Sequence, residues 1–335
     1  MEAKRVSELP RDDGWQFEPK WDGFRCLAWK DEGAVALCGK SGKSLARYFP
    51  EVTQALLALA IPRFCIDGEL VIPLGRELSF DSLQQRLHPA ETRIKKLSQA
   101  TPALLIAFDC LMNARGTNLL QRPLTERRDA LERLFAKVPS DSGLRLSPFT
   151  REYRQAQQWL DRSSSALDGV IAKPVDGVYR CGERAMLKVK PLQTADCVVG
   201  GFRYGAGTRQ VGSLLLGLYD ESARLHHVGF TSSIASADRA ALTRRLQPLI
   251  EPPGFTGDAP GGPSRWSTER SAQWQPLRPT LVVEVLYDQV TDGRFRHGTR
   301  LLRWRPDKPA EQCTCDQLRP PARPSALIKR IVAGG

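Results

Sequence analysis

Short apolar runs alternate with amphipathic stretches along the first half of the chain, and this alternation predicts a mixed α and β unit. The apolar runs predict strands at 26–29, 34–38, 64–72, 104–111, 169–172 and 186–189. The amphipathic stretches predict helices at 51–60, 79–87, 124–136 and 153–163. Asp67-Gly68 interrupts the run at 64–72, so we expect that strand to be broken there, and Ser79 and Asp81 are candidate helix caps.

From Thr194 onward, β-rich segments separated by turn residues replace this alternation. They lie at 198–202, 213–219, 225–230 and 281–286, with one helical stretch at 236–246 and a Pro/Gly-rich loop at 252–263. Short strands in this arrangement suit a small β-barrel of the OB-fold kind. We expect the domain boundary just after Lys190 and a loosely ordered tail beyond Leu318.

The composition adds a strong positive charge to this picture. The chain has 335 residues, which suits about two domains. Lys and Arg number 49 against 37 Asp and Glu, and the net charge of +12 favours a polyanionic partner, usually nucleic acid, over a merely basic soluble protein. The start, 1–12, has no apolar signal core, and no window is long and apolar enough for a membrane span, so we expect an intracellular protein.

The cysteines and histidines form no metal-ligand pattern. Six of the eight cysteines stand singly, mostly in apolar runs, and are expected to be buried like small hydrophobic residues: Cys26, Cys38, Cys65, Cys110, Cys181 and Cys197. Cys313 and Cys315 have no second pair at the spacing of a zinc site. His226 and His227 are adjacent, so on a strand their side chains would point to opposite faces. The pattern excludes a zinc finger and a Cys/His protease.

The sharpest chemical pattern is Glu18-Pro19-Lys20-Trp21-Asp22-Gly23-Phe24-Arg25. A Lys just before a strand, followed by an acid-Gly turn and an Arg, puts an amine and a guanidinium near one point. A lysine amine becomes a nucleophile when neighbouring cations and desolvation favour its uncharged form. An arginine fork suits a phosphate or a ribose. Taken alone, the segment could also be an exposed hairpin with solvated charges.

Further motifs follow in order, and together they resemble those of the nucleotidyltransferase superfamily of ATP-dependent DNA ligases, RNA ligases and mRNA capping enzymes. The motifs lie at 20–25, 39–43, 66–70, 107–109, 168–173, 187–190 and 305–308. Each later motif is short, and their joint order and spacing carry the resemblance over nearly the whole chain. Lys40 stands where the family usually has Arg, and Asp168 stands where Glu is usual.

The resemblance implies that Lys20 attacks the α-phosphorus of ATP and carries AMP. It also implies an ATP-binding set: Glu18, Arg25, Lys40, Glu69, Phe108, Lys173, Lys188, Lys190, Arg305 and Lys308. Within this set, Glu18 would accept a hydrogen bond from the adenine amino group, and Phe108 would stack on the base unless it is a core residue. Arg25 and Lys40 would hold ribose and phosphate.

The same resemblance places cations and carboxylates around the triphosphate. Lys188 and Lys190 would contact the α-phosphate; they alternate along a strand, and two like charges on one face repel unless an anion binds there. Glu69 and Asp168 would supply carboxylates to Mg²⁺, for which Mn²⁺ could substitute, although both stand beside a Gly and could be ordinary turn acids.

A second cationic segment lies near the C-terminal end. Six cations fall between 294 and 308, interleaved with Phe295 and Trp304, which suits a phosphate backbone better than a solvated face. In the family, the motif at 305–308 closes over ATP and orients pyrophosphate. The remaining arginines are therefore expected on DNA: Arg294, Arg296, Arg300 and Arg303.

The whole pattern predicts an ATP-dependent DNA ligase that acts in DNA repair and resembles compact two-domain bacterial ligases of the LigC type, since no helical DNA-binding domain precedes the first motif. We expect a nucleotidyltransferase (adenylation) domain of antiparallel sheets and helices at 1–192, an OB-fold domain at 193–318 and a flexible tail at 319–335. The expected partners are nicked double-stranded DNA and a repair polymerase or end-binding protein. We expect a monomer, located in the bacterial cytoplasm at the nucleoid. The alternatives are an RNA ligase or capping-type nucleotidyltransferase, and a non-catalytic nucleic-acid-binding module.

Overall fold

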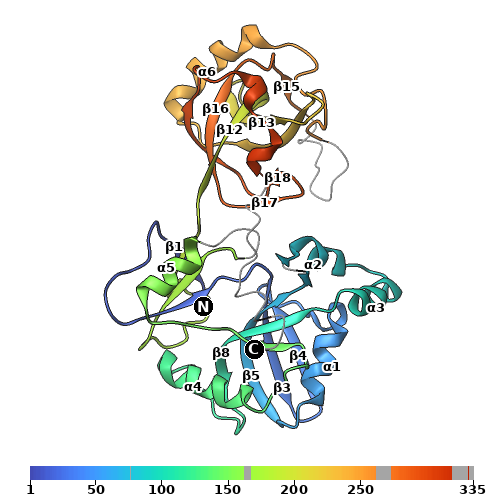
Figure 1. The fold of residues 1–335 in the computed structure, drawn as a ribbon, viewed down its shortest axis with the longest axis vertical. Coiled ribbons are helices and arrows are strands. Elements are labelled where there is room, and N and C mark those ends of the chain that lie inside the picture. The colour runs from blue at the N-terminus through green and yellow to red at the C-terminus, as the bar shows by residue number, and fades with distance from the viewer. Residues whose placement is uncertain (76, 162–166, 262–272, 319–330, 332–335) are drawn as a thin grey trace. The chain divides into compact units, whose positions relative to one another are not determined.

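In the computed structural model the chain folds as two compact units, Met1–Pro191 with Ala322–Gly335, and Leu192–Pro321 (Figure 1). The structure describes residues 1–75, 77–161, 167–261, 273–318 and 331. The expected tail at 319–335 lies outside the described residues except for Ile331, as do the end of the helix expected at 153–163 and the end of the loop expected at 252–263. No helix in the described part of the chain is long and apolar enough to cross a membrane.

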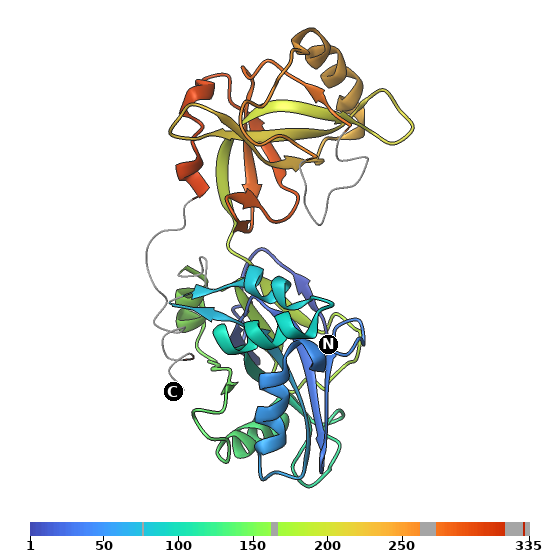
Figure 2. The same cartoon turned by 90° about the vertical axis from the view of Figure 1, so that its right-hand side faces the viewer.

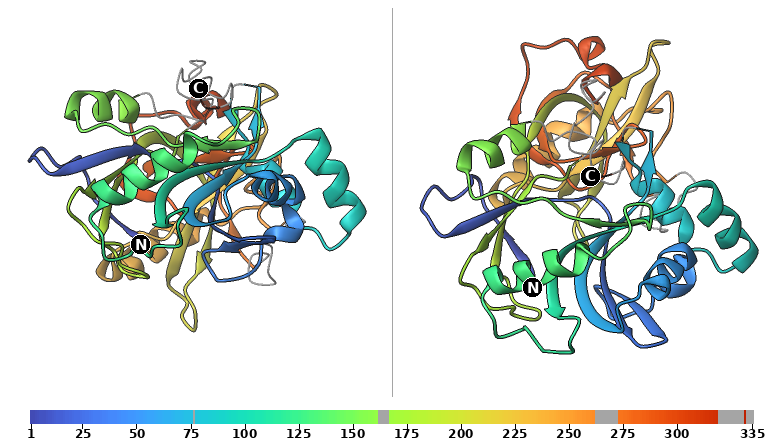
Figure 3. Two further views of the ribbon diagram at one scale, coloured as in Figure 1. Left: turned by 90° about the horizontal axis from the view of Figure 1, so that it is seen from below. Right: turned by 60° about the horizontal axis from the view of Figure 1, so that its bottom comes forward.

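The first unit is built on a five-stranded sheet of order β4-β3-β5-β8-β9, antiparallel except for the last pair (Figure 3). Its strands are β3 (Phe24–Asp31), β4 (Ala34–Gly39), β5 (Arg63–Val71), β8 (Leu104–Met112) and β9 (Leu144–Leu146). Helix α1 (Pro50–Ala58) packs against β4, and α4 (Leu124–Phe135) packs against β8 and β9. The apolar sides of these elements form the main core of the unit.

A second, four-stranded sheet in this unit has the order β1-β11-β10-β2. Its strands are β1 (Ala3–Arg5), β2 (Trp15–Pro19), β10 (Val170–Pro174) and β11 (Met186–Val189). The β1–β11 pair is parallel and the other pairs are antiparallel, with α5 (Tyr153–Asp161) packed on β2 and β10. Thus the segment before Lys20 and two later motifs lie side by side in one sheet.

The remaining elements of the first unit are short. Helix α2 (Phe80–Arg86) begins at Ser79, whose Oγ accepts from the Ser82 backbone N–H at 3.2 Å, which confirms that cap. It is followed by α3 (Glu91–Ala100), and β6 (Pro73–Leu74) pairs with β7 (Glu77–Leu78). Ile331 is buried in a cluster with Trp21, and its carbonyl accepts from Arg145 Nε at 2.7 Å.

The second unit is a strongly paired antiparallel sheet of order β14-β13-β12-β16-β19, with β15 also on β12 (Figure 2). Its strands are β12 (Gln193–Tyr204), β13 (Val211–Tyr219), β14 (Leu225–Thr231), β15 (Gln275–Pro276), β16 (Val282–Tyr287) and β19 (Arg300–Trp304). One isolated parallel bridge, Thr231 to Thr299, joins its two edge regions. Helix α6 (Arg239–Leu246) and the hairpin of β17 (Val290–Thr291) and β18 (Arg294–Phe295) complete the unit.

The architecture of helices and antiparallel sheets followed by a β-rich unit confirms the expected fold class, but particular expectations were wrong. Strand β5 is continuous through Asp67 and Gly68, although its pairing with β8 shifts register between these two residues. A Cβ at Gly68 would lie 2.7 Å from the Ile106 carbonyl oxygen, so this Gly permits close pairing with β8 rather than a break. Cys181 is exposed, not buried, and α3 was not predicted.

Two buried carboxylates lie opposite each other on neighbouring strands of the five-stranded sheet. Asp67 on β5 is in register with Asp109 on β8, an arrangement that repels unless each charge has a partner. Arg127 gives Asp109 two hydrogen bonds, from Nε at 2.8 Å and from Nη2 at 3.1 Å. Its Nη1 donates to the carbonyls of Arg122 and Gly177. The buried guanidinium is therefore satisfied only while Asp109 is present.

We expect Asp109→Ala to lower the free energy of unfolding by about 3–5 kcal/mol, because Arg127 would keep a buried charge without its carboxylate. Equilibrium denaturant unfolding measures this change. Glu126→Ala is the matched control, since its ion pair with Arg122 is exposed and should contribute about 0.5 kcal/mol or less. Equal effects of the two substitutions would contradict the assignment.

Candidate active site

Lys20 directly follows β2 and is tied to the start of β10 by its backbone. Its N–H donates to the Gly169 carbonyl at 2.9 Å, and its carbonyl accepts from the Asp168 N–H at 2.8 Å. Gly169 has φ +129°, and a Cβ there would lie 2.0 Å from the Val189 carbonyl oxygen. Only glycine permits this approach of β10 to β11. The backbone therefore brings the motifs of Lys20, Asp168 and Val189 to one point.

The side chains at this point form a cluster of lysines around one carboxylate. Asp168 is 5% exposed, and its Oδ2 contacts the Lys20 ammonium while Oδ1 lies 2.8 Å from Lys190 Nζ. Lys188 and Lys190 flank buried Val189, and burial together with repulsion from Lys20 and Lys190 lowers the pKa of Lys188. One carboxylate cannot balance three ammonium groups, so the cluster favours a bound anion.

Glu69 stands near this cluster on β5, in register with Arg25 on β3. It is partly buried, and desolvation raises the pKa of its carboxyl to about 8 although Lys20 acts in the opposite direction. A Cβ at Gly23 would lie 2.9 Å from Glu69 Cγ and 2.1 Å from the Leu70 carbonyl oxygen. Gly23 thus lets the segment after Lys20 lie directly against Glu69.

Arg25 is bound within the protein through all three nitrogens. Nε donates to Asp67 Oδ1 at 3.0 Å, Nη1 donates to the Met1 carbonyl, and Nη2 donates to Asp67 Oδ2 and to the Tyr179 hydroxyl. The Tyr179 hydroxyl donates to Asp67 Oδ2 at 2.8 Å, and burial raises the pKa of Tyr179. The sequence analysis missed Asp67 and Tyr179 in this network. The available signal was the carboxylate inside an apolar run.

The residues expected around adenine lie together. Glu18 is 2% exposed, accepts from Gln16 Nε2 at 2.8 Å and pairs with Lys173 Nζ at 2.7 Å. Lys173 Nζ also lies 4.7 Å from the centre of the Phe108 ring. Phe108 is only partly buried, unlike its neighbours in β8, so it is not an ordinary core residue. The structure assembles this group, and its role in binding a base stays a prediction.

Lys40 is the most exposed member of the expected set. It lies in the turn between Gly39 and Lys43, its side chain is 70% exposed, and its Nζ lies 3.0 Å from Glu2 Oε1. Within the described residues, His, Cys, Asp and Glu side chains form no group of three or more that could hold a metal ion. A metal at Glu69 and Asp168 would therefore need oxygen ligands from substrate or water.

In the second unit, Arg305 and Lys308 share one carboxylate that the sequence analysis also missed. Asp196 on β12 is 13% exposed, and its oxygens lie 2.9 Å from Arg305 Nη1 and 2.9 Å from Lys308 Nζ. Asp307 holds the other side of the Arg305 guanidinium, with Nη2 donating at 2.9 Å. Both cations are thus oriented by carboxylates of their own unit.

The arginines expected on DNA lie at or near the surface, but most have internal partners. Arg294 Nη2 lies 2.7 Å from His227 Nδ1, Arg296 donates to Gln289 at 3.0 Å, and Arg303 donates to Glu284 at 2.5 Å. Arg300 is exposed. The interleaved aromatics are not free surface groups, because Phe295 is buried in the core and the Trp304 ring is covered by Arg245 at 4.4 Å.

Comparison with known families agrees with this fold and site. The family model described as "ATP dependent DNA ligase domain" matches residues 2–190, and the model described as "ATP dependent DNA ligase C terminal region" matches residues 207–308. The chain belongs to the ATP-dependent DNA ligase family.

Within this family the chain is of the DNA ligase C type. It is 41% identical to DNA ligase C2 of Mycolicibacterium smegmatis, over 98% of this chain and 96% of the relative. It is 40% identical to DNA ligase C of Mycobacterium tuberculosis, over 100% of this chain and 96% of the relative. A solved Lig E DNA ligase shares the fold with a TM-score of 0.56 at 16% identity, covering 91% of this chain and 100% of that one.

His226 and His227 point to opposite sides of β14, as expected, and have opposite pKa shifts. The Nδ1 of buried His227 accepts from Arg294, and desolvation together with Arg294 and Arg203 lowers its pKa to about 3. Hydrogen bonds to Asp220 and Asp258 raise the pKa of His226. Protonation therefore destabilises the fold at His227 and stabilises it at His226.

We expect the free energy of unfolding to fall as the pH drops below about 6.5. In this range His227 binds a proton in the unfolded chain, whereas in the folded chain it stays neutral down to about pH 3. This group alone contributes at most about 1.4 kcal/mol per pH unit. Thermal unfolding across this range should show that His227→Asn loses less stability than the wild type as the pH falls. The amide oxygen of Asn can still accept a hydrogen bond from Arg294. His226→Asn is the control and should steepen the loss. Identical pH profiles for all three proteins would disprove the assignment.

Proposed function

We propose that this chain seals nicks in double-stranded DNA by way of an AMP group carried on Lys20. The observation that carries the proposal is the position of the Lys20 amine beside Asp168, Lys188 and Lys190, where positive charge is concentrated around one buried carboxylate. The family match supports the proposal, because the ATP-dependent DNA ligase domain model covers residues 2–190 and so includes all the residues of this cluster. The domains at 1–192 and 193–318 would act as the adenylation domain and the OB-fold domain.

In the first step, Lys20 Nζ attacks the α-phosphorus of ATP. A phosphorus–nitrogen bond forms, the bond to the oxygen that bridges to the β-phosphate breaks, and pyrophosphate leaves. The attacking amine must first lose a proton, which passes to solvent. Lys188 and Lys190 would then balance charge on the phosphoryl oxygens, with no reorganisation of the site.

In the following steps, the 5′-phosphate at the nick attacks the phosphorus of lysine-AMP and Lys20 leaves. The 3′-hydroxyl then attacks the activated 5′-phosphate, a phosphodiester forms and AMP departs. Glu18, Lys173 and Phe108 would bind the adenine, while Arg25 and Lys40 would face ribose and phosphate. Arg305 and Lys308 would orient pyrophosphate, and Arg294, Arg296, Arg300 and Arg303 would contact the DNA backbone.

We also propose that Glu69 and Asp168 hold Mg²⁺, or Mn²⁺ in its place. The donor set suits it, because this ion typically takes one or two carboxylates plus substrate oxygens. A carboxyl with its pKa raised to about 8 is also one that a nearby cation would stabilise as the anion. When bound, the ion would offset negative charge on the phosphoryl oxygens.

The biological setting proposed is DNA repair by a monomer in the bacterial cytoplasm at the nucleoid, together with a polymerase or end-binding protein. An RNA ligase or capping enzyme would use the same lysine chemistry, but the family match is to DNA ligases in both units. A non-catalytic binding module would leave the Lys20 cluster without a use.

We expect Lys20→Arg to abolish both transfer of label from α-labelled ATP to the protein and nick sealing, because a guanidinium stays charged and cannot attack phosphorus. Gel detection of acid-labile, lysine-linked AMP measures the first activity. Lys43→Arg, an exposed lysine in the turn after β4, is the matched control and should keep both. If Lys20→Arg protein seals nicks whose 5′-phosphate does not already carry AMP, the proposal is refuted. If the wild-type protein uses GTP in place of ATP, a capping enzyme is favoured.

We expect Asp196→Asn to slow AMP transfer to Lys20 about tenfold, equivalent to about 1.4 kcal/mol, because Arg305 and Lys308 lose the charge that orients them. Single-turnover label transfer measures the rate, and gel shift measures binding to nicked DNA. Glu284→Gln removes the carboxylate that holds Arg303 on the neighbouring strand and should leave the transfer rate within about twofold. An unchanged rate in Asp196→Asn would exclude the positioning role.

A further inference from the structure

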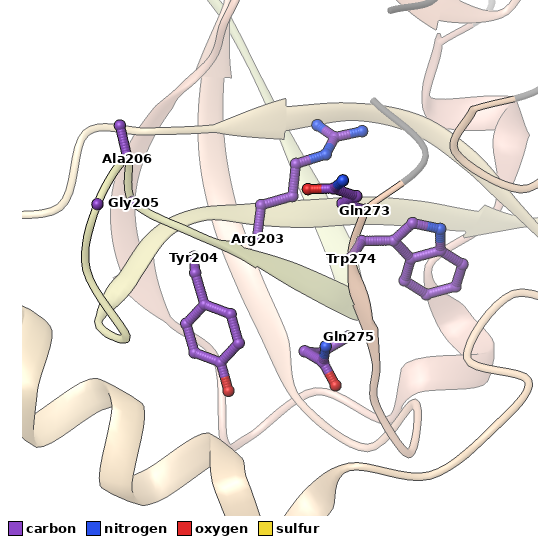
Figure 4. A pocket seen from close by; sticks show the side chains of 8 residues that line it. Arg203, Tyr204, Gly205, Ala206, Gln273, Trp274 and Gln275 are labelled. Atoms are coloured by element: carbon purple, nitrogen blue, oxygen red, sulfur yellow. The ribbon is translucent and has the colours of Figure 1, made fainter. Parts of the chain in front are cut away.

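A hollow of about 640 Å³ lies on the second unit, and its described lining residues lie outside the expected DNA-contact segment 294–308. Its lining comes from two places in the chain. One side is the end of β12 and the loop after it, 203–207, and the other is the segment 273–275 that leads into β15 (Figure 4). The size falls within the range of small-ligand sites.

The aromatic side of the hollow is fixed by close packing. A Cβ at Gly201 would lie 2.7 Å from Trp274 Cε3, so the indole lies directly on the glycine backbone of β12. The edge-to-face contact between Trp274 and Phe255, with centroids 5.5 Å apart, holds the ring from another side. Trp274 nevertheless stays partly exposed. A ring held in this way can stack on a planar ligand without first losing conformational freedom.

The polar side of the hollow is cationic and rich in amides. Arg203 is half-buried, desolvation lowers its pKa, and a nearby negative charge would favour its charged form. Gln273 and Gln275 also line the hollow (Figure 4). None of the described residues that line it is acidic. An aromatic face, a cation and amides that both donate and accept together match a nucleotide: a base, its phosphate and its hydrogen-bonding edge.

We propose that this hollow binds one unpaired nucleotide of the DNA strand, with the base on Trp274, the phosphate at Arg203 and the base edge at Gln273 and Gln275. The base must be unpaired, because a base inside a duplex has both faces covered by its stacking neighbours. This inference rests on the proposed function, since a ligase meets such nucleotides at gaps, flaps and single-stranded ends. The site would let the chain distinguish ends with unpaired nucleotides from simple nicks.

The test compares two DNA probes on the full chain by fluorescence anisotropy: short oligo(dT), and a nicked duplex without unpaired nucleotides. Trp274→Ala should weaken oligo(dT) binding about fivefold to a hundredfold, the range that loss of one stacked base gives, and change nicked-duplex binding less than about twofold. Trp274→Phe keeps a stacking face and should retain most of the affinity. Trp29→Ala, which removes a tryptophan 37% exposed on the first unit, is the matched control and should change neither.

Because Trp274 also packs on Gly201, two further variants keep the test informative if Trp274→Ala unfolds. Gln273→Ala at an exposed position and Arg203→Gln should each weaken oligo(dT) binding selectively, and Arg203→Gln should lower its salt dependence by about one phosphate contact. Loss of equal size on both probes would mean a duplex contact, and no loss on oligo(dT) would mean no nucleotide site; either result overturns the proposal. Label transfer to Lys20 and nick sealing, measured on the same wild-type preparation, report separately whether the proposed function itself holds.

Discussion

The buried carboxylate of Asp168, in contact with both Lys20 and Lys190, is the interaction on which the candidate active site depends. Lysines this close repel one another, and burial together with this repulsion lowers the pKa of Lys188. The carboxylate allows the cluster to exist, yet it balances only one of the charges that meet there. The fold therefore concentrates positive charge at this point, which favours a bound anion.

In the second unit, too, a carboxylate holds two neighbouring cations in place. Arg305 and Lys308 lie in the turn that follows β19, where long cationic side chains would otherwise sample many rotamers. Asp196, on a different strand, gathers both ends at one place. In each unit one shielded carboxylate holds a pair of cations, so the positive charges are fixed by short-range contacts as well as by the local motif. This explains how short and individually weak motifs can specify a precise arrangement of charge.

The sequence predicted most strands, the helices with strong apolar periodicity and the lysines of the cluster, because each of these is encoded locally. Strand β5 shows where local encoding stops: Asp67 in an apolar run suggested a break, but its partners Arg25 and Tyr179 stand 42 and 112 positions away. Asp196 is likewise 109 positions from Arg305. A carboxylate has no local signal that tells whether a distant cation will meet it, so these positioning residues could not be identified from the pattern alone.

The density of charged residues along the sequence is likewise a poor guide to nucleic-acid contacts, because it does not show which charges have partners elsewhere in the fold. The arginine-rich segment gave the strongest signal, yet Arg303 and Arg305 each pair with a carboxylate of their own unit, which reduces the positive potential they offer. The hollow near Arg203 and Trp274 gave no such signal, because its lining is assembled from separate segments and Arg203 is the one cation among its described residues. What distinguishes it is a fixed aromatic ring and a half-buried cation, with no acid among the lining residues that the structure describes. Contacts of that kind depend on shape and desolvation, which only the folded chain defines.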